Sequence, residues 1–78
     1  MKATDLQDRL ARLAPGETLL LLKTEVEQAF NSYPTSEERH AAAARLAAWY
    51  RSRLTFYGPG ESQIRFTRHN DGEGTNFR

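Results

Sequence analysis

Side chains that can bind phosphate are concentrated in the second half of the chain. Residues 39–78 contain seven arginines and three acidic residues, a balance of +4, whereas residues 1–38 contain four Lys or Arg and seven acidic residues, a balance of −3. Both histidines also lie in the second half. Arginine binds phosphate groups and guanine edges through two parallel hydrogen bonds. This half therefore has the chemistry of a nucleic-acid contact, although arginines can also simply keep a helix and a hairpin in solution.

Other chemistries lack the residues that they require. The chain has no cysteine, which excludes disulfides and thiolate zinc sites. The two histidines, His40 and His69, are not spaced as metal ligands, and no nucleophile-elbow or HExxH motif occurs. The glycine pairs within 58–60 and 72–74 indicate turns rather than phosphate-binding loops, because neither precedes a helix. We therefore expect no enzymatic activity, no cofactor and no metal.

The composition predicts one small domain with a thin core. The chain has 78 residues and a net charge of +1; ten of its apolar residues are alanine, and Leu, Ile, Val and Phe together number fifteen. So small a core can hardly also form the walls of a deep pocket. No apolar run is long enough to span a membrane, and the N-terminus lacks the apolar stretch of a signal peptide. We expect a cytoplasmic protein with one domain over residues 1–70 and a flexible tail or third strand over 71–78.

Three capping-box patterns predict three helices. The first box starts at Thr4, and its helix ends before the Pro-Gly pair at 15–16. The second box starts at Thr24 and opens a short helix. The third starts at Thr35, or at the serine that follows it, and opens the longest helix, which we expect to run to about Arg53.

Two kinds of strand signal accompany the helices. Residues 54–57 and 63–67 alternate apolar and polar side chains around Gly58-Pro59-Gly60-Glu61, a sequence that suits a type II turn, so they predict a β-hairpin. Residues 19–22 are four consecutive leucines, which periodicity alone does not assign. Because a turn and a helix cap bound this run, we interpret it as a short strand buried on both faces. The alternative is a continuous helix over 17–30.

The predicted order is helix, strand, helix, helix, strand, turn, strand. This α+β arrangement of three helices with a C-terminal β-hairpin resembles the winged helix-turn-helix DNA-binding domain over residues 4–68. The resemblance implies that the third helix enters the major groove of double-stranded DNA, that the hairpin turn is the wing, and that the protein is a regulator acting as a dimer. Its candidate DNA-binding residues are Ser36, Arg39, His40, Arg45, Gln63, Arg65, Arg68 and His69.

Two features depart from that family. The third helix begins with Ser36-Glu37-Glu38, and these carboxylates would be repelled by phosphates. The segment 31–35 is also longer than a tight helix-turn-helix turn. Both departures disfavour specific readout of the major groove by this helix, and they favour a contact led by the hairpin or by phosphates.

The long helix has one side of small residues. At about 100° per residue, one side gathers Ala42, Ala43, Leu46, Trp49 and Tyr50, whereas the other carries alanines. Such a face permits close approach of another element, a second copy or a nucleic-acid backbone, although alanine is also simply the best helix former. It supports an alternative function, a small protein-binding inhibitor or adaptor of the kind that phages and mobile elements encode. The candidate partner interface is Ala41, Ala44, Ala48 and Ser52.

Overall fold

The computed structural model describes residues 1–70 as three helices and a three-stranded antiparallel sheet. The order of elements is α1 (Ala3–Ala11), β1 (Thr18–Leu22), α2 (Lys23–Ala29), α3 (Ser36–Trp49), β2 (Ser52–Tyr57), the 3-10 turn η1 (Pro59–Glu61) and β3 (Gln63–Arg68). The predicted α+β class with a C-terminal hairpin is confirmed. The predicted tail or third strand over 71–78 lies outside the described residues. None of the described helices is long and apolar enough to cross a membrane.

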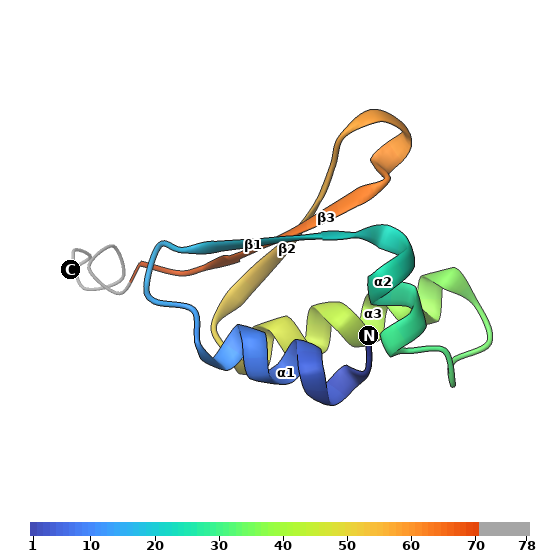
Figure 1. Cartoon of the computed structure of the whole chain (residues 1–78), viewed down its shortest axis with the longest axis horizontal. Coiled ribbons are helices and arrows are strands. Elements are labelled where there is room, and N and C mark those ends of the chain that lie inside the picture. The colour runs from blue at the N-terminus through green and yellow to red at the C-terminus, as the bar shows by residue number, and fades with distance from the viewer. Residues whose placement is uncertain (71–78) are drawn as a thin grey trace.

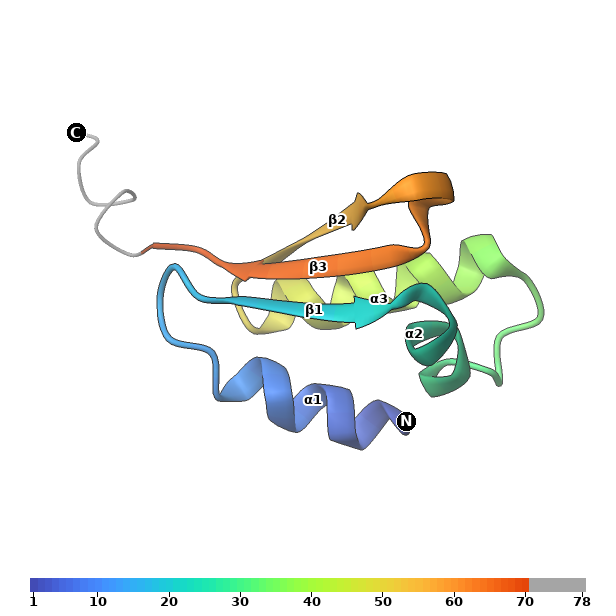
Figure 2. The same ribbon diagram turned by 45° about the horizontal axis from the view of Figure 1, so that its top comes forward.

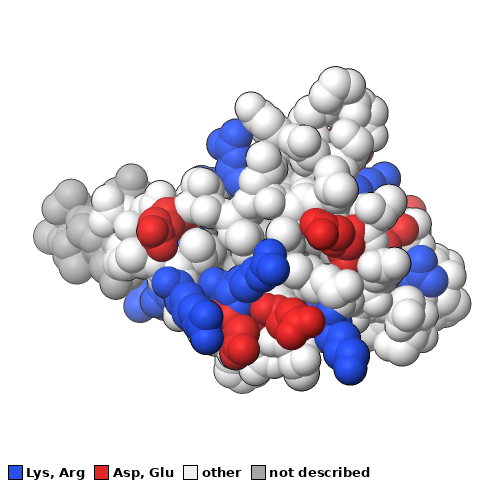
Figure 3. Space-filling view, viewed as in Figure 1, with Lys and Arg blue, Asp and Glu red and all other residues white. Residues whose placement is uncertain are grey.

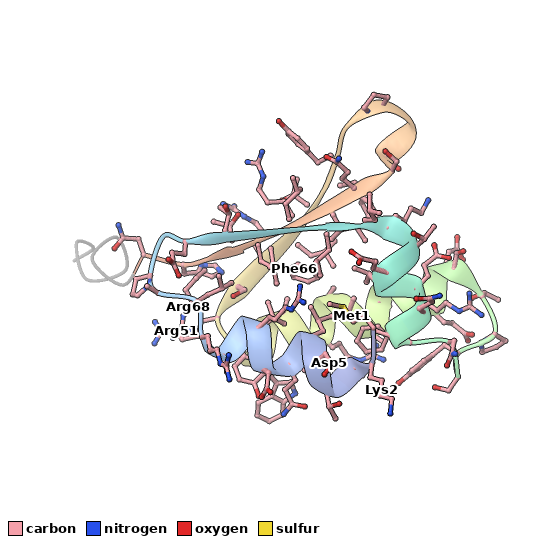
Figure 4. All side chains as sticks on the ribbon, in the orientation of Figure 1. Met1, Lys2, Asp5, Arg51, Phe66 and Arg68 are labelled. Carbon is pink, nitrogen blue, oxygen red and sulfur yellow. The ribbon has the colours of Figure 1, made fainter. Side chains whose placement is uncertain are left out.

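The sheet has one covered face and one open face. Its strand order is β1-β3-β2, and the helices lie on a single side of it (Figure 1, Figure 2). Ile64 and Phe66 of the central strand are fully buried on the helix side, and Figure 4 shows Phe66 between the sheet and α1. The rest of the buried core cluster comes from all three helices and β1: Leu6, Leu10, Leu21, Val26, Ala43 and Ala47.

The run of four leucines forms a strand, but the prediction that it is buried on both faces was wrong. Leu21 is 6% exposed, whereas Leu20 and Leu22 are 49% and 51% exposed. Successive side chains of a strand point to opposite faces of the sheet. Because the helices form a single layer, alternate leucines of this strand face the core and the open side.

Carboxylates, rather than the predicted threonine hydroxyls, cap the first two helices. The side chains of Asp5 and Glu25 each accept a hydrogen bond from the backbone N–H three residues earlier, at 3.3 and 3.2 Å. Thr4 and Thr24 are therefore inside α1 and α2 rather than at their N-caps. An acid in the first turn also interacts favourably with the helix dipole. At α3 the prediction of Thr35 as the cap is confirmed, because its hydroxyl accepts from a backbone N–H at 3.1 Å.

The long helix ends earlier than predicted. α3 stops at Trp49, Arg51 turns the chain with a φ of +55°, and β2 begins at Ser52. The residues that were expected to form the last helical turn therefore belong to a turn and a strand. Trp49 was expected on the same side as Ala43, yet it is 82% exposed.

The hairpin turn agrees with the sequence. The N–H of Glu61 donates to the carbonyl of Gly58 at 3.0 Å and closes the turn. Gly60 has a φ of +64°, and a positive φ at this position is what a type II turn requires. Figure 1 shows that this end of the hairpin projects beyond the helices.

Candidate nucleic-acid interface

The basic residues at the start of α3 are partly buried and bound to neighbouring groups. Nε2 of His40 lies 2.9 Å from a carboxylate oxygen of Glu27, and its ring packs edge-on against Phe56 with centroids 5.0 Å apart. Arg39 donates from Nε to the carbonyl of Tyr33 at 2.8 Å, and its Nη1 lies 3.8 Å from Glu27. The structure therefore brings these two predicted contact residues together around an acid of α2, where they join α2 to α3 rather than face outward.

The exposed part of the first turn of α3 is acidic. Glu37 and Glu38 are exposed, and the hydroxyl of Ser36 donates to Glu27 at 3.4 Å. Of the basic α3 residues predicted to contact DNA, Arg45 is the exposed one, two turns further along the helix. This end of α3 therefore presents negative charge to any approaching phosphate.

The open face of the sheet has the opposite character, and we call it the outer sheet face. Its nine strand positions form three rows across β1, β3 and β2. None of these positions is Asp or Glu, whereas Arg53 and Arg65 add two positive charges. The nearby Glu17, just before β1, has its carboxylate bound to the N–H of Ala14 at 2.8 Å. The rows are Thr18, Thr67 and Arg53; Leu20, Arg65 and Thr55; and Leu22, Gln63 and Tyr57.

A cation–aromatic pair positions the Arg65 side chain near the middle of this face. The guanidinium carbon of Arg65 lies 4.3 Å from the centre of the Tyr57 ring. A guanidinium stacks on an aromatic ring through the attraction between its charge and the ring face, and its N–H groups remain directed outward in its plane. The pair therefore holds a predicted contact residue in place without neutralising its charge.

A polar hollow lies at the other end of the outer sheet face. Its volume is about 250 Å³, and Gly16, Arg53, Thr67 and His69 are among the residues that line it. Arg53 and His69 are both exposed. A guanidinium, a hydroxyl and an imidazole are all donors that bind phosphate oxygens. The hollow thus combines the predicted His69 with Arg53, a residue that was expected at the end of the long helix and lies instead in β2.

Arg68 is used structurally. Its Nη1 donates to the carbonyl of Leu13 at 2.9 Å, and its backbone N–H donates to the carbonyl of Glu17. Figure 4 shows the labelled Arg68 between the sheet and the end of α1. It therefore ties β3 to the end of α1, and its side chain does not extend the basic edge as the sequence analysis expected.

The predicted partner interface is partly reorganised. Ala41, Ala44 and Ala48 are exposed on α3, as expected. Ser52 does not belong with them, because it is 5% exposed in β2 and its hydroxyl donates to the carbonyl of Tyr50 at 3.1 Å. The signal that could have shown this was the alternation of residues 52–57, which begins two residues before the predicted strand.

Among the described residues, the side of the molecule that carries α1 has no basic patch like that of the outer sheet face. On the side that carries α1, Lys and Arg are interspersed with Asp and Glu (Figure 3). No family model, no curated protein and no solved structure matches this chain. Its function is therefore argued from the placement of its own residues.

Proposed function

We propose that this protein binds double-stranded DNA through its outer sheet face. The observation that carries the proposal is that Arg53 and Arg65 lie on this face and His69 lines the hollow at its end, while none of the strand positions of the face is acidic. A surface whose strand positions carry cations and no carboxylate attracts a polyanion, and contacts with phosphates supply most of the sequence-independent affinity for DNA.

The proposal assigns α3 a smaller role than the resemblance implied. Arg39 and His40 are bound to Glu27, and the exposed Glu37 and Glu38 would repel a phosphate backbone. Hydrogen bonds to phosphates position a protein on DNA but carry little sequence information. We accordingly expect weak discrimination between DNA sequences.

The geometry of the hairpin also locates the contact. Its tip carries the exposed Glu61, whereas the cations lie in the strands and beyond the end of β3. Phosphates are therefore expected to lie against the body of β2 and β3, from the Arg65–Tyr57 pair to the hollow near His69. In this arrangement the tip of the wing stays outside the main contact.

The test is the salt dependence of binding to a short fluorescent duplex, measured by anisotropy. With two or three phosphates neutralised, raising the salt from about 50 to about 200 mM should weaken binding by about 10- to 40-fold. Replacing Arg53 or Arg65 by Gln should remove one contact and reduce the slope of log affinity against log salt by about 0.9.

Arg9→Gln is the matched control, because Arg9 is an exposed arginine of α1 and loses the same charge. Its slope should equal that of the unmodified protein. Absence of binding at about 50 mM salt, or equal losses in all three variants, would show that the outer sheet face is not a DNA site. Tighter binding to the corresponding single strand would reject duplex DNA as the ligand.

A further inference from the structure

The largest exposed apolar side chain lies on α3, away from the sheet. Trp49, the one tryptophan of the chain, is 82% exposed. It lines a groove of about 330 Å³ with Gln7, Leu46 and Tyr50, and a second hollow with Arg45 and Ala48. Trp49 borders the partly buried Leu46 and Tyr50, so the apolar surface extends beyond one side chain, and a contiguous apolar patch is typical of an interaction site.

The exposed side of α3 has an ordered pattern of charge and size. Glu38 lies in the first turn, the alanines 41, 44 and 48 form the middle, and Arg45 and Trp49 lie toward the C-terminal end. We call this surface the α3 outer face; its exposed residues are Glu37, Glu38, Ala41, Ala44, Arg45, Ala48 and Trp49. Glu38 and Arg45 lie on the same flank of it, about two turns apart.

We infer that the α3 outer face pairs with the same face of a second copy of this chain, with the two α3 helices antiparallel. A two-fold interface requires a patch that is complementary to itself. In an antiparallel pair of identical helices, a residue of one copy and the residue opposite it in the other copy have sequence numbers that always add up to the same value. The register that places Glu38 opposite Arg45 of the second copy also places Arg45 opposite Glu38, so both ion pairs form at once.

The same register places two other residues of the face. It brings Ala41 next to the centre of the pair, and side chains that end at Cβ let two helix axes approach to about 8 Å. It also brings Trp49 near the segment that precedes α3 of the second copy, where Pro34 is exposed. An apolar ring would thereby cover the exposed tryptophan at each end.

A second copy fits this face better than DNA does. The exposed Glu37 and Glu38 outnumber Arg45, so the charge along the helix does not favour a polyanion. A parallel pair would set Glu38 against its own copy. Because Ala43 and Ala47 point from the other side of α3 into the core, the α3 outer face points away from the sheet. The inference is therefore independent of the proposed DNA contact, and the dimer leaves the outer sheet face open.

Sedimentation equilibrium and tryptophan fluorescence of the full chain test this pairing. The protein should pass from monomer to dimer between about 5 and about 500 μM, the range in which a modest interface associates. Over the same range the emission of Trp49 should move to shorter wavelength as water leaves the ring. A monomer with unshifted emission throughout would overturn the inference, and so would a trimer or larger assembly.

Matched variants locate the interface. Ala44→Glu should weaken dimerisation by at least about tenfold, since a buried unpaired charge is costly. Ala11→Glu, at an exposed alanine of α1, should not change it. Circular dichroism confirms that each variant is folded, and Ala44→Gln repeats the test without a charge. Equal association of the Ala44 and Ala11 variants would overturn the assignment.

A charge exchange tests the antiparallel register. Glu38→Arg and Arg45→Glu should each weaken the dimer, because each sets like charges opposite one another. The double variant restores opposite charges in both ion pairs and should recover most of the affinity. Failure of the double variant to recover would rule out this register.

Discussion

The open and covered faces of the sheet can be compared by one substitution made at two adjacent leucines. Leu21 is 6% exposed and belongs to the core cluster, whereas Leu20 is 49% exposed beside Arg65 on the outer sheet face. Truncating a buried leucine to alanine costs about 2–5 kcal/mol, since it removes contacts and leaves a cavity. Complete burial of a leucine contributes about 1.5–3 kcal/mol, so a half-exposed one should cost about 1 kcal/mol.

The magnitudes are large relative to the stability of so small a protein. For 78 residues, the free energy of unfolding is expected to be about 4–12 kcal/mol. In a domain of this size each 1 kcal/mol lowers the midpoint of thermal unfolding by about 4–8 °C. Leu21→Ala should therefore lower the midpoint by at least about 8 °C, and Leu20→Ala by about half of that or less.

The assay is thermal and urea unfolding followed by circular dichroism, with each variant compared with the unmodified protein. A shift of β1 by one residue would exchange every side chain between the two faces. Equal losses at Leu20 and Leu21, or a larger loss at Leu20, would therefore refute the register of β1 against β3. Leu22→Ala is a second control, because Leu22 lies on the same open face as Leu20.

Five further substitutions test three local features. Thr35→Ala removes the side-chain cap of α3 and should cost about 1 kcal/mol, measured by urea unfolding. Gly58→Asn should lower the free energy of unfolding by about 1–3 kcal/mol, because φ +82° and ψ 174° suit glycine almost exclusively. Gly60→Asn should be nearly neutral, because asparagine tolerates φ +64° and ψ 17°. Equal thermal midpoints of these two variants would contradict this expectation. Glu27→Ala leaves His40 without its 2.9 Å partner and should cost about 1–3 kcal/mol, with a smaller loss for Glu37→Ala as the control.

Patterns that repeat within a few residues predicted most of the fold. The alternation at Ile64 and Phe66, and the Gly-Pro-Gly turn before them, identified the hairpin because both signals are local. The leucine run was harder, since four identical residues have no visible period. Its two faces differ because helices cover one side of β1, and that is a property of the complete fold.

The ends of helices and strands that depend on backbone geometry were harder to predict from the sequence. The end of α3 carries no glycine or proline, and the chain reverses at Arg51 with a positive φ that non-glycine residues adopt infrequently. Without a stop signal the helix was extended to Arg53. That error moved Arg53 away from the outer sheet face and placed Ser52 in an exposed interface.

The candidate site depended on contacts between distant residues. Helical periodicity indicates which side of α3 His40 occupies, but not that Glu27, thirteen residues earlier, binds it. The same holds for Arg68, whose side chain reaches the carbonyl of Leu13 across 55 residues. The sequence shows how many basic residues the chain has. Whether each of them can contact DNA depends on the partners that the fold brings next to it.

The single layer of helices explains why the outer sheet face is open. A chain with fifteen Leu, Ile, Val and Phe residues can cover one face of its sheet, and Leu20, Leu22 and Tyr57 remain half exposed on the other. The two leucines lie in β1 at one edge, while Arg53 lies in β2 at the opposite edge. Because aliphatic side chains gain nothing from phosphate, a DNA backbone on this face would follow β2 and β3 and leave the edge of β1 uncovered.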